Sequence, residues 1–153
     1  MPKIVFVCTG NTCRSPMAEL LLKKMLHERG IEGWRVFSAG ISAFPGQTIS
    51  RNAADVLKDE GIDSSKHLSK ELSKEMISEA SLLITMTRVH KKIILEEFPE
   101  YADKIYTLKE CSNSETGDVI DPYGQSHDIY IDTRDDIKES LEGVLGKLAQ
   151  SKN

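Results

Sequence analysis

A short segment near the N-terminus constrains this chain more than any other feature. It places a cysteine and an arginine six positions apart, between an apolar run and a helix-starting sequence. Residues 3–7 (KIVFV) read as a short buried strand, and Ser15-Pro16 is typical of an N-cap followed by proline at the first helical position. Residues 8–15 are therefore predicted to form a tight loop that leads into a helix.

The same loop carries the groups needed to bind and attack a phosphoryl group. Backbone N–H groups in such a turn converge on one point, where the helix dipole favours an anion the size of phosphate. Arg14 can bind two oxygens of that anion, and Cys8 lies at the base of the same cradle, where positive surroundings favour the nucleophilic thiolate. The predicted phosphate-binding residues are Thr9, Gly10, Asn11, Thr12, Cys13, Arg14 and Ser15.

Two other interpretations of this segment are weaker. A cysteine at the end of an apolar strand is usually a small core residue, but a core cysteine does not need Gly10, Arg14 and Pro16 at this spacing. The loop also lacks the lysine of G-x-x-x-x-G-K-[ST] and the second and third glycines of G-x-G-x-x-G. The sequence therefore predicts no nucleotide cofactor.

Length and charge limit the class of protein. A chain of 153 residues is predicted to form one domain over 1–153, and its net charge of −4 argues against a nucleic-acid partner. The first apolar run is too short for a signal peptide, and no stretch approaches the roughly 18 apolar residues of a membrane span. We therefore expect a cytoplasmic protein with no membrane partner. Three cysteines without a C-x2-C pair predict neither a disulfide scaffold nor a metal site, and nothing indicates an oligomeric state.

Apolar runs alternate with helical patterns along the chain. This alternation predicts a single-domain α/β fold, a four-stranded parallel sheet with helices on both faces. Ligands of such sheets bind beyond the carboxyl ends of the strands, where the Cys8 loop begins. The predicted strands are 3–7, 34–37, 82–86 and 105–108; the predicted helices are 15–29, 50–60, 74–79, a segment ended by Pro99, and 129–149, with a polar loop over 109–128.

A general acid is needed opposite Cys8, because phosphoryl transfer to a thiolate leaves negative charge on the departing atom. Asp121 lies on the long polar loop, which could place its carboxyl group over the substrate, and Pro122 would fix the backbone beside it. Taken alone, Asp121-Pro122 indicates only a turn. The prediction of an acid therefore depends on the Cys8 loop.

The chain resembles the low-molecular-weight protein tyrosine phosphatase family in three features: V-C-T-G-N-T-C-R-S-P near the N-terminus, D-P-Y-G near the C-terminus, and its length. The resemblance implies the fold of that family and a reaction without metal or cofactor. In that reaction Cys8 attacks phosphorus, Asp121 protonates the leaving group, and the cysteinyl phosphate is hydrolysed. It also implies that Asn11, Ser15, Ser38 and His67 support the loop. From the residues alone, Asn11 tolerates a left-handed backbone, whereas a lone histidine such as His67 indicates little.

Further predictions concern the surroundings of the cradle. Phe44 and Tyr123 lie on loops that should flank it and are candidates for pocket walls, with ordinary loop packing as the alternative. Cys13 could form a protective disulfide with Cys8 on oxidation, or it could be a thiol that only packs. Cys111 is expected to be a passive thiol, and no role is predicted for His27, His90 or His127.

Two positions indicate which phosphorylated residue of a protein is the substrate. Family members acting on phosphotyrosine usually carry an aliphatic residue where this chain has Thr12, and an aspartate where it has Thr87. Thr12 instead resembles the bacterial protein-arginine phosphatase branch, so phosphoarginine is the favoured substrate and phosphotyrosine the alternative. An arsenate reductase needs relay cysteines that 81–95 lacks, and a non-catalytic phosphate-binding module would be expected to lack Cys8 or Asp121.

Overall fold

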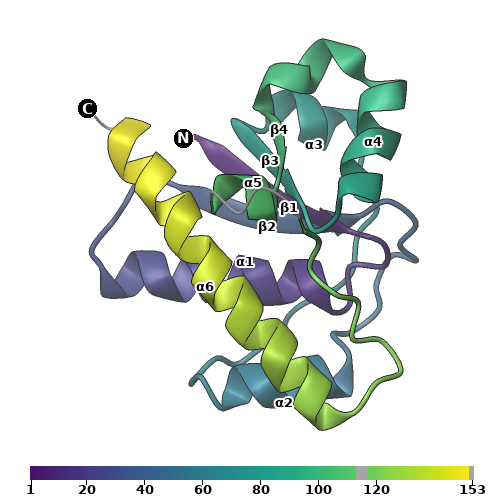
Figure 1. Ribbon diagram of the computed structural model, residues 1–153, viewed down its shortest axis with the longest axis vertical. Helices are drawn as coiled ribbons and strands as arrows, with labels where there is room; N and C mark the ends of the chain where they lie inside the picture. Colours follow the sequence, from purple (N-terminus) through teal and green to yellow (C-terminus); the bar gives the residue numbers. More distant parts are fainter. Residues whose placement is uncertain (113–116, 152–153) are drawn as a thin grey trace.

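A parallel sheet of four strands, in the order β2-β1-β3-β4, forms the centre of the computed structural model, which describes residues 1–112 and 117–151 (Figure 1). β1 pairs with β2 on one side and with β3 on the other, so its last residue, Cys8, lies in the interior of the sheet's carboxyl edge. The predicted four-stranded parallel sheet is confirmed. The strands are β1 (Lys3–Cys8), β2 (Arg35–Gly40), β3 (Leu82–Thr85) and β4 (Ile105–Thr107).

Helices cover both faces of the sheet, as predicted. α1 and α6 cross one face with α2 packed against them, and α3 and α4 lie on the other face (Figure 1). None of the helices in 1–112 and 117–151 is long and apolar enough to cross a lipid bilayer. The helices are α1 (Arg14–Glu28), α2 (Arg51–Lys58), α3 (Lys74–Glu79), α4 (Arg88–Glu97), the 3-10 helix η1 (Pro99–Lys104), α5 (Leu108–Cys111) and α6 (His127–Ser151).

The two faces of β1 point into two clusters of buried apolar side chains. Ile4 and Phe6 pack with residues of α1 and α6, whereas Val5 and Val7 pack with residues of α3 and α4. Side chains of a strand alternate in this way, and a strand covered on both faces reads as an unbroken apolar run. Burial of each such side chain stabilises the fold by about 1.5–3 kcal/mol. The strand that ends in Cys8 is therefore firmly fixed.

The start of α1 differs from the prediction. The helix begins at Arg14 and its N-cap is Cys13, so Ser15 lies within the first turn and is not the capping residue. The Ser15 hydroxyl is instead hydrogen-bonded to the Cys8 thiol, with 2.8 Å between Oγ and Sγ. Pro16 is tolerated because N–H groups in the first turn have no partner within the helix.

The chain around β4 also differs in part. The prediction of a strand over 105–108 is wrong at Leu108, which begins α5 because Thr107 and Glu110 form a capping box. The loop predicted over 109–128 is helical at both ends, and its residues 113–116 lie outside the described residues. α4 ends before Pro99, as predicted, but the proline also begins η1, which was not predicted.

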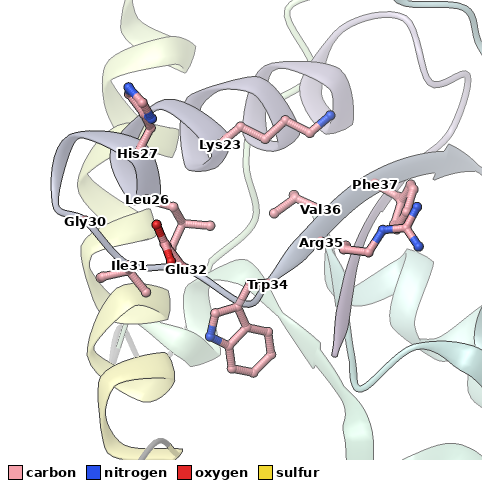
Figure 2. Close-up of a pocket in the computed structure, with 10 residues that line it drawn as sticks. All are labelled: Lys23, Leu26, His27, Gly30, Ile31, Glu32, Trp34, Arg35, Val36 and Phe37. Carbon is pink, nitrogen blue, oxygen red and sulfur yellow. The ribbon is translucent and has the colours of Figure 1, made fainter. Parts of the chain in front are cut away.

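A cavity of about 570 Å³ lies between the end of α1 and the start of β2, with side chains from Lys23 to Phe37 around it (Figure 2). α1 has 15 residues and is therefore roughly 22 Å long. Because the Cys8 loop enters the other end of α1, this cavity is remote from the predicted cradle.

Candidate active site

The loop that follows β1 has the backbone shape expected of a phosphate cradle. Asn11 has a φ of 57°, the left-handed conformation that asparagine tolerates, as the sequence predicted. The carbonyl oxygens of Cys8, Thr9 and Thr12 accept backbone hydrogen bonds of 2.9 Å each from Ile41, Ser42 and Ser50. The residues that follow β2 and the residue that precedes α2 therefore fix the loop by hydrogen bonds to its carbonyl oxygens.

Gly40, the last residue of β2, allows this close approach. A Cβ atom at this position would lie 2.5 Å from the Thr9 carbonyl oxygen and 3.0 Å from the Asn11 backbone nitrogen. Both neighbours are backbone atoms, so they could move only if the cradle itself moved. Glycine is therefore required for the loop to keep its shape at the edge of the sheet.

A buried chain of hydrogen bonds connects the sheet and α1 to the nucleophile candidate. Ser38 donates its hydroxyl hydrogen to the Glu19 carboxylate at 2.6 Å, so its oxygen accepts from the Asn11 amide at 2.9 Å. The second hydrogen of that amide goes to the Ser15 hydroxyl, also at 2.9 Å. Because Ser15 accepts there, its own hydrogen can go either to the Cys8 sulfur at 2.8 Å or to the Ala39 carbonyl oxygen at 3.4 Å.

Both oxygen atoms of Asn11 are also hydrogen-bonded. Its side-chain oxygen accepts from the backbone N–H of Lys70 at 3.0 Å, and its backbone oxygen lies 2.8 Å from Nε2 of His67, which acts as the donor. The structure therefore brings together all four residues that the resemblance implied as loop supports, Asn11, Ser15, Ser38 and His67.

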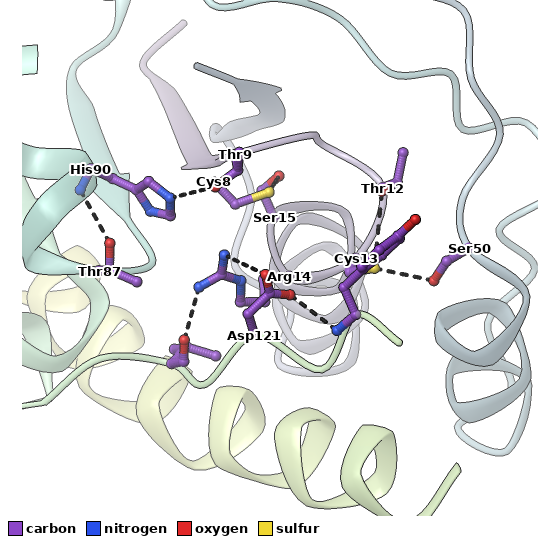
Figure 3. Close-up of polar contacts among 12 residues, drawn as sticks. Cys8, Thr9, Thr12, Cys13, Arg14, Ser15, Ser50, Thr87, His90 and Asp121 are labelled. Carbon is purple, nitrogen blue, oxygen red and sulfur yellow. Dashed lines mark hydrogen bonds and ion pairs between the residues drawn. The ribbon is translucent and has the colours of Figure 1, made fainter. Parts of the chain in front are cut away.

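Arg14 and Asp121 meet at the open side of the cradle (Figure 3). The Arg14 guanidinium donates to the Val119 carbonyl at 3.0 Å and lies 3.7 Å from the Asp121 carboxylate. That carboxylate also accepts from the backbone N–H of Tyr123 at 3.1 Å. Arg14 is almost fully buried, whereas the Asp121 side chain is 55% exposed. The predicted acid therefore faces the predicted nucleophile loop and remains accessible to solvent.

These groups surround a cavity of about 380 Å³. Phe44 and Tyr123, the predicted wall residues, both line it, and the two residues are 76% and 74% exposed. Thr12 lines it too. Thr87 is instead the N-cap of α4, where its hydroxyl accepts from the His90 backbone N–H, so its presence has a structural reason. The cavity is lined by Cys8, Thr9, Gly10, Thr12, Cys13, Arg14, Ser42, Phe44, Gln47, Asp121 and Tyr123.

The other two cysteines differ in their surroundings. The Cys13 sulfur lies 3.3 Å from the Ser50 hydroxyl and 3.4 Å from the Tyr130 hydroxyl, and Cys13 and Cys8 are both free thiols in this structure. Cys111 is buried beneath α6, and burial raises the pKa of its thiol to about 11. A thiol that stays protonated is a poor nucleophile, which agrees with the passive role predicted for Cys111.

No role was predicted for Glu19, Gly40 and His90, nor for Ser42 and Gln47, which line the cavity. Glu19 follows Ser15 by one helical turn and lies on the same helix face as buried leucines. A charged residue on an apolar helix face could have indicated a buried polar role for Glu19. His90 follows β3, whose carboxyl end lies at the same edge of the sheet, and its Nε2 is 2.9 Å from the Thr9 hydroxyl. Gly40 carries no signal in the sequence that predicts its contacts.

Known proteins resemble this chain in sequence and in fold. Residues 3–153 match the family described as low molecular weight phosphotyrosine protein phosphatase. A protein-arginine-phosphatase of Bacillus subtilis is 42% identical over 97% of this chain and 98% of its own. The low molecular weight protein-tyrosine-phosphatase PtpB of Staphylococcus haemolyticus is 36% identical over 95% of this chain and 96% of its own. A solved YwlE arginine phosphatase mutant with a phosphorylated active-site serine has a TM-score of 0.91 and 42% identity, over 96% of this chain and 95% of that chain.

Proposed function

Because this chain belongs to the low molecular weight phosphotyrosine protein phosphatase family, we propose that it removes phosphoryl groups from arginine residues of cytoplasmic proteins, with Cys8 as the nucleophile. The observation that carries the proposal is the meeting of Cys8, Arg14 and Asp121 around one cavity. The 42% identity to the protein-arginine-phosphatase of Bacillus subtilis supports the choice of phosphoarginine.

The proposed reaction has two steps. In the first, the Cys8 thiolate attacks phosphorus, the bond from phosphorus to the guanidinium nitrogen breaks, and Asp121 gives that nitrogen a proton. In the second, water attacks the cysteinyl phosphate while Asp121 takes a proton from it, which releases inorganic phosphate and restores the thiolate. Arg14 and the loop N–H groups bind the phosphoryl oxygens throughout.

Thr12 is the proposed determinant of the substrate residue, since it lines the cavity between Asn11 and Cys13. Phosphoarginine brings a planar cationic guanidinium, which the Asp121 carboxylate can bind through paired hydrogen bonds. Beside that group, Thr12 supplies a hydroxyl and presents less apolar surface than an isoleucine would. A phosphotyrosine ring would instead gain from apolar contact.

Replacing Thr12 with isoleucine is expected to lower kcat/KM for a phosphoarginine peptide and raise it for a phosphotyrosine peptide. The ratio of the two kcat/KM values should shift by at least about tenfold, because one added or missing side-chain group in a binding pocket changes specificity by roughly 10- to 200-fold. Isoleucine keeps the β-branch, so the loop backbone should persist. Side-by-side kinetics on the two peptides measures the ratio. A valine variant, which removes the hydroxyl without adding length, separates the hydroxyl from the wall.

An unchanged ratio in Thr12→Ile would remove Thr12 as the determinant, and an equal loss with both peptides would indicate damage to the loop. Phosphotyrosine remains the second candidate substrate. The exposed rings of Phe44 and Tyr123 beside the cavity favour it, since they could flank a phenyl group, and PtpB of Staphylococcus haemolyticus is 36% identical to this chain. Equal or better turnover of the phosphotyrosine peptide by the unmodified enzyme would select this alternative.

We further propose that Cys13 protects Cys8 during oxidation. Peroxide would convert the Cys8 thiolate to a sulfenic acid, and the Cys13 thiol would then displace water to form a disulfide that a dithiol can reduce. After mild peroxide and then dithiothreitol, the wild type should regain most of its activity and Cys13→Ala much less. Cys111→Ala, which removes a thiol outside the cavity, should recover like the wild type. Equal recovery of Cys13→Ala and the wild type would show that Cys13 has no such role.

A further inference from the structure

His90 is a buried histidine at the edge of the cradle that the proposed reaction does not use. It lies in the first turn of α4, where its backbone N–H is bound by Thr87, and its side chain reaches toward the loop after β1 (Figure 3). Only 6% of its surface is exposed. Its Nε2 atom lies 2.9 Å from the hydroxyl oxygen of Thr9, the residue that follows Cys8.

The ring of His90 is neutral at physiological pH. Burial, and then the positive charge of Arg14, lower its pKa to about 4. A neutral imidazole carries one proton, on either Nδ1 or Nε2. Nδ1 is buried and has no hydrogen-bond partner among the described residues. A buried N–H without a partner is rarer than a buried acceptor without one, so the proton belongs on Nε2.

This tautomer determines the direction of the bond between His90 and Thr9. With the proton on Nε2, the imidazole donates and the Thr9 hydroxyl oxygen accepts. The hydrogen of that hydroxyl is then available for another acceptor, and the Thr9 side chain has no other hydrogen-bond partner in 1–112 and 117–151. Thr9 is exposed and lines the cavity together with Cys8 and Arg14. Because Arg14 and the backbone N–H groups of the loop surround this cavity, the acceptor expected there is an anion.

We propose that His90 is a positioning residue that turns the Thr9 hydroxyl into a donor to the phosphoryl group held in the cavity. Thr9 would add a side-chain hydrogen bond to those of the loop N–H groups and Arg14, and His90 would fix the direction of that bond. The inference rests on the proposed function in one respect, namely that a phosphoryl group occupies the cavity. It does not depend on whether arginine or tyrosine carries that group.

The test is a double-mutant cycle on Thr9→Val and His90→Leu, with kcat/KM for an aryl phosphate and for a phosphoarginine peptide, and with the inhibition constant of inorganic phosphate. Each single variant should lower kcat/KM for both substrates by roughly 10- to 100-fold, the scale of one hydrogen bond to a charged group. Phosphate inhibition should weaken in the same variants. The double variant should lose no more than Thr9→Val alone, because His90 acts only through the Thr9 hydroxyl.

Conservative variants separate positioning from packing. Thr9→Ser keeps the hydroxyl and His90→Gln keeps an N–H near the place of Nε2, so both should recover most of the activity. His27→Leu removes an exposed histidine at the far end of α1 and should behave like the wild type. Melting temperatures show whether each variant is folded, and a small decrease is expected for Thr9→Val, which removes the acceptor of the buried His90 Nε2–H.

Two results would overturn the inference. One is additive losses in the double variant, which would mean that His90 acts independently of Thr9. The other is wild-type kinetics and phosphate inhibition in Thr9→Val. Both results presuppose that the unmodified protein hydrolyses an aryl phosphate. An inactive wild type would count against the proposed function. An active wild type with unaffected variants would count only against the role of His90.

Discussion

Replacing Cys8 with serine should abolish turnover of aryl phosphate and of phosphoarginine peptides while leaving the binding of inorganic phosphate intact. A serine hydroxyl is a far weaker nucleophile than a thiolate, and a phosphoserine would be a poor leaving group in the second step. The cradle should persist, because serine can still accept the hydrogen bond of Ser15 and the loop is held by backbone contacts. Steady-state kinetics measures the loss, and isothermal titration with phosphate measures what remains.

Cys111→Ala is the matched control for removing a buried cysteine. It lies beneath α6 and does not line the cavity, so its activity should equal that of the wild type. Retention of wild-type aryl-phosphate hydrolysis in Cys8→Ser would contradict the assignment of the nucleophile. Loss of phosphate binding in the same variant would show that the cradle depends on the thiol itself.

Asp121→Asn should lower kcat by roughly 10²- to 10⁴-fold, the usual contribution of a general acid or base. Asparagine can still accept the hydrogen bond from the Tyr123 backbone N–H, so the loop should keep its position while the proton is lost. The loss should be smaller for an aryl phosphate whose leaving group needs no proton. A series of aryl phosphates with different leaving groups, compared under identical conditions, measures this dependence.

Asp128→Asn serves as the control for this prediction. It removes the same charge from an exposed carboxylate in the first turn of α6, seven positions further along the chain, and it should leave kcat unchanged. If Asp121→Asn lowered the rate equally for good and poor leaving groups, Asp121 would not act as the acid for leaving-group departure. An effect of Asp128→Asn as large as that of Asp121→Asn would assign the loss to charge alone.

The sequence predicted the architecture well because the pattern that determines it is local. The apolar run before Cys8 and the alternation of strands and helices were sufficient for the parallel sheet and for its helix layers. Element ends were less predictable. Ser15 has the residue type of an N-cap, but a tertiary contact with Cys8 uses its hydroxyl, and Leu108 continues an apolar run although the capping box of Thr107 and Glu110 starts a helix there.

For the site, the motifs and the family resemblance identified the loop residues and also Ser38, His67 and Asp121, but they missed Glu19 and His90, which reach the site from helices. Asn11, Arg14 and Asp121 belong to recognisable patterns; Arg14 and Asp121 line the cavity, and Asn11 is buried within the loop that borders it. Glu19 and His90 act through contacts made across the fold, with Ser38 and Thr9 respectively. No spacing in the sequence encodes these contacts, because they depend on which side of a helix meets which strand.

The left-handed backbone of Asn11 has a thermodynamic consequence. A non-glycine residue in this region is disfavoured, yet Asn11 is fully buried and four neighbours bind its side chain and carbonyl oxygen. The conformational entropy of ordering the loop is thus lost when the chain folds and need not be lost again on association. An arriving anion meets a receptor already in its bound shape, so more of the interaction energy is available as affinity and as stabilisation of the reacting state.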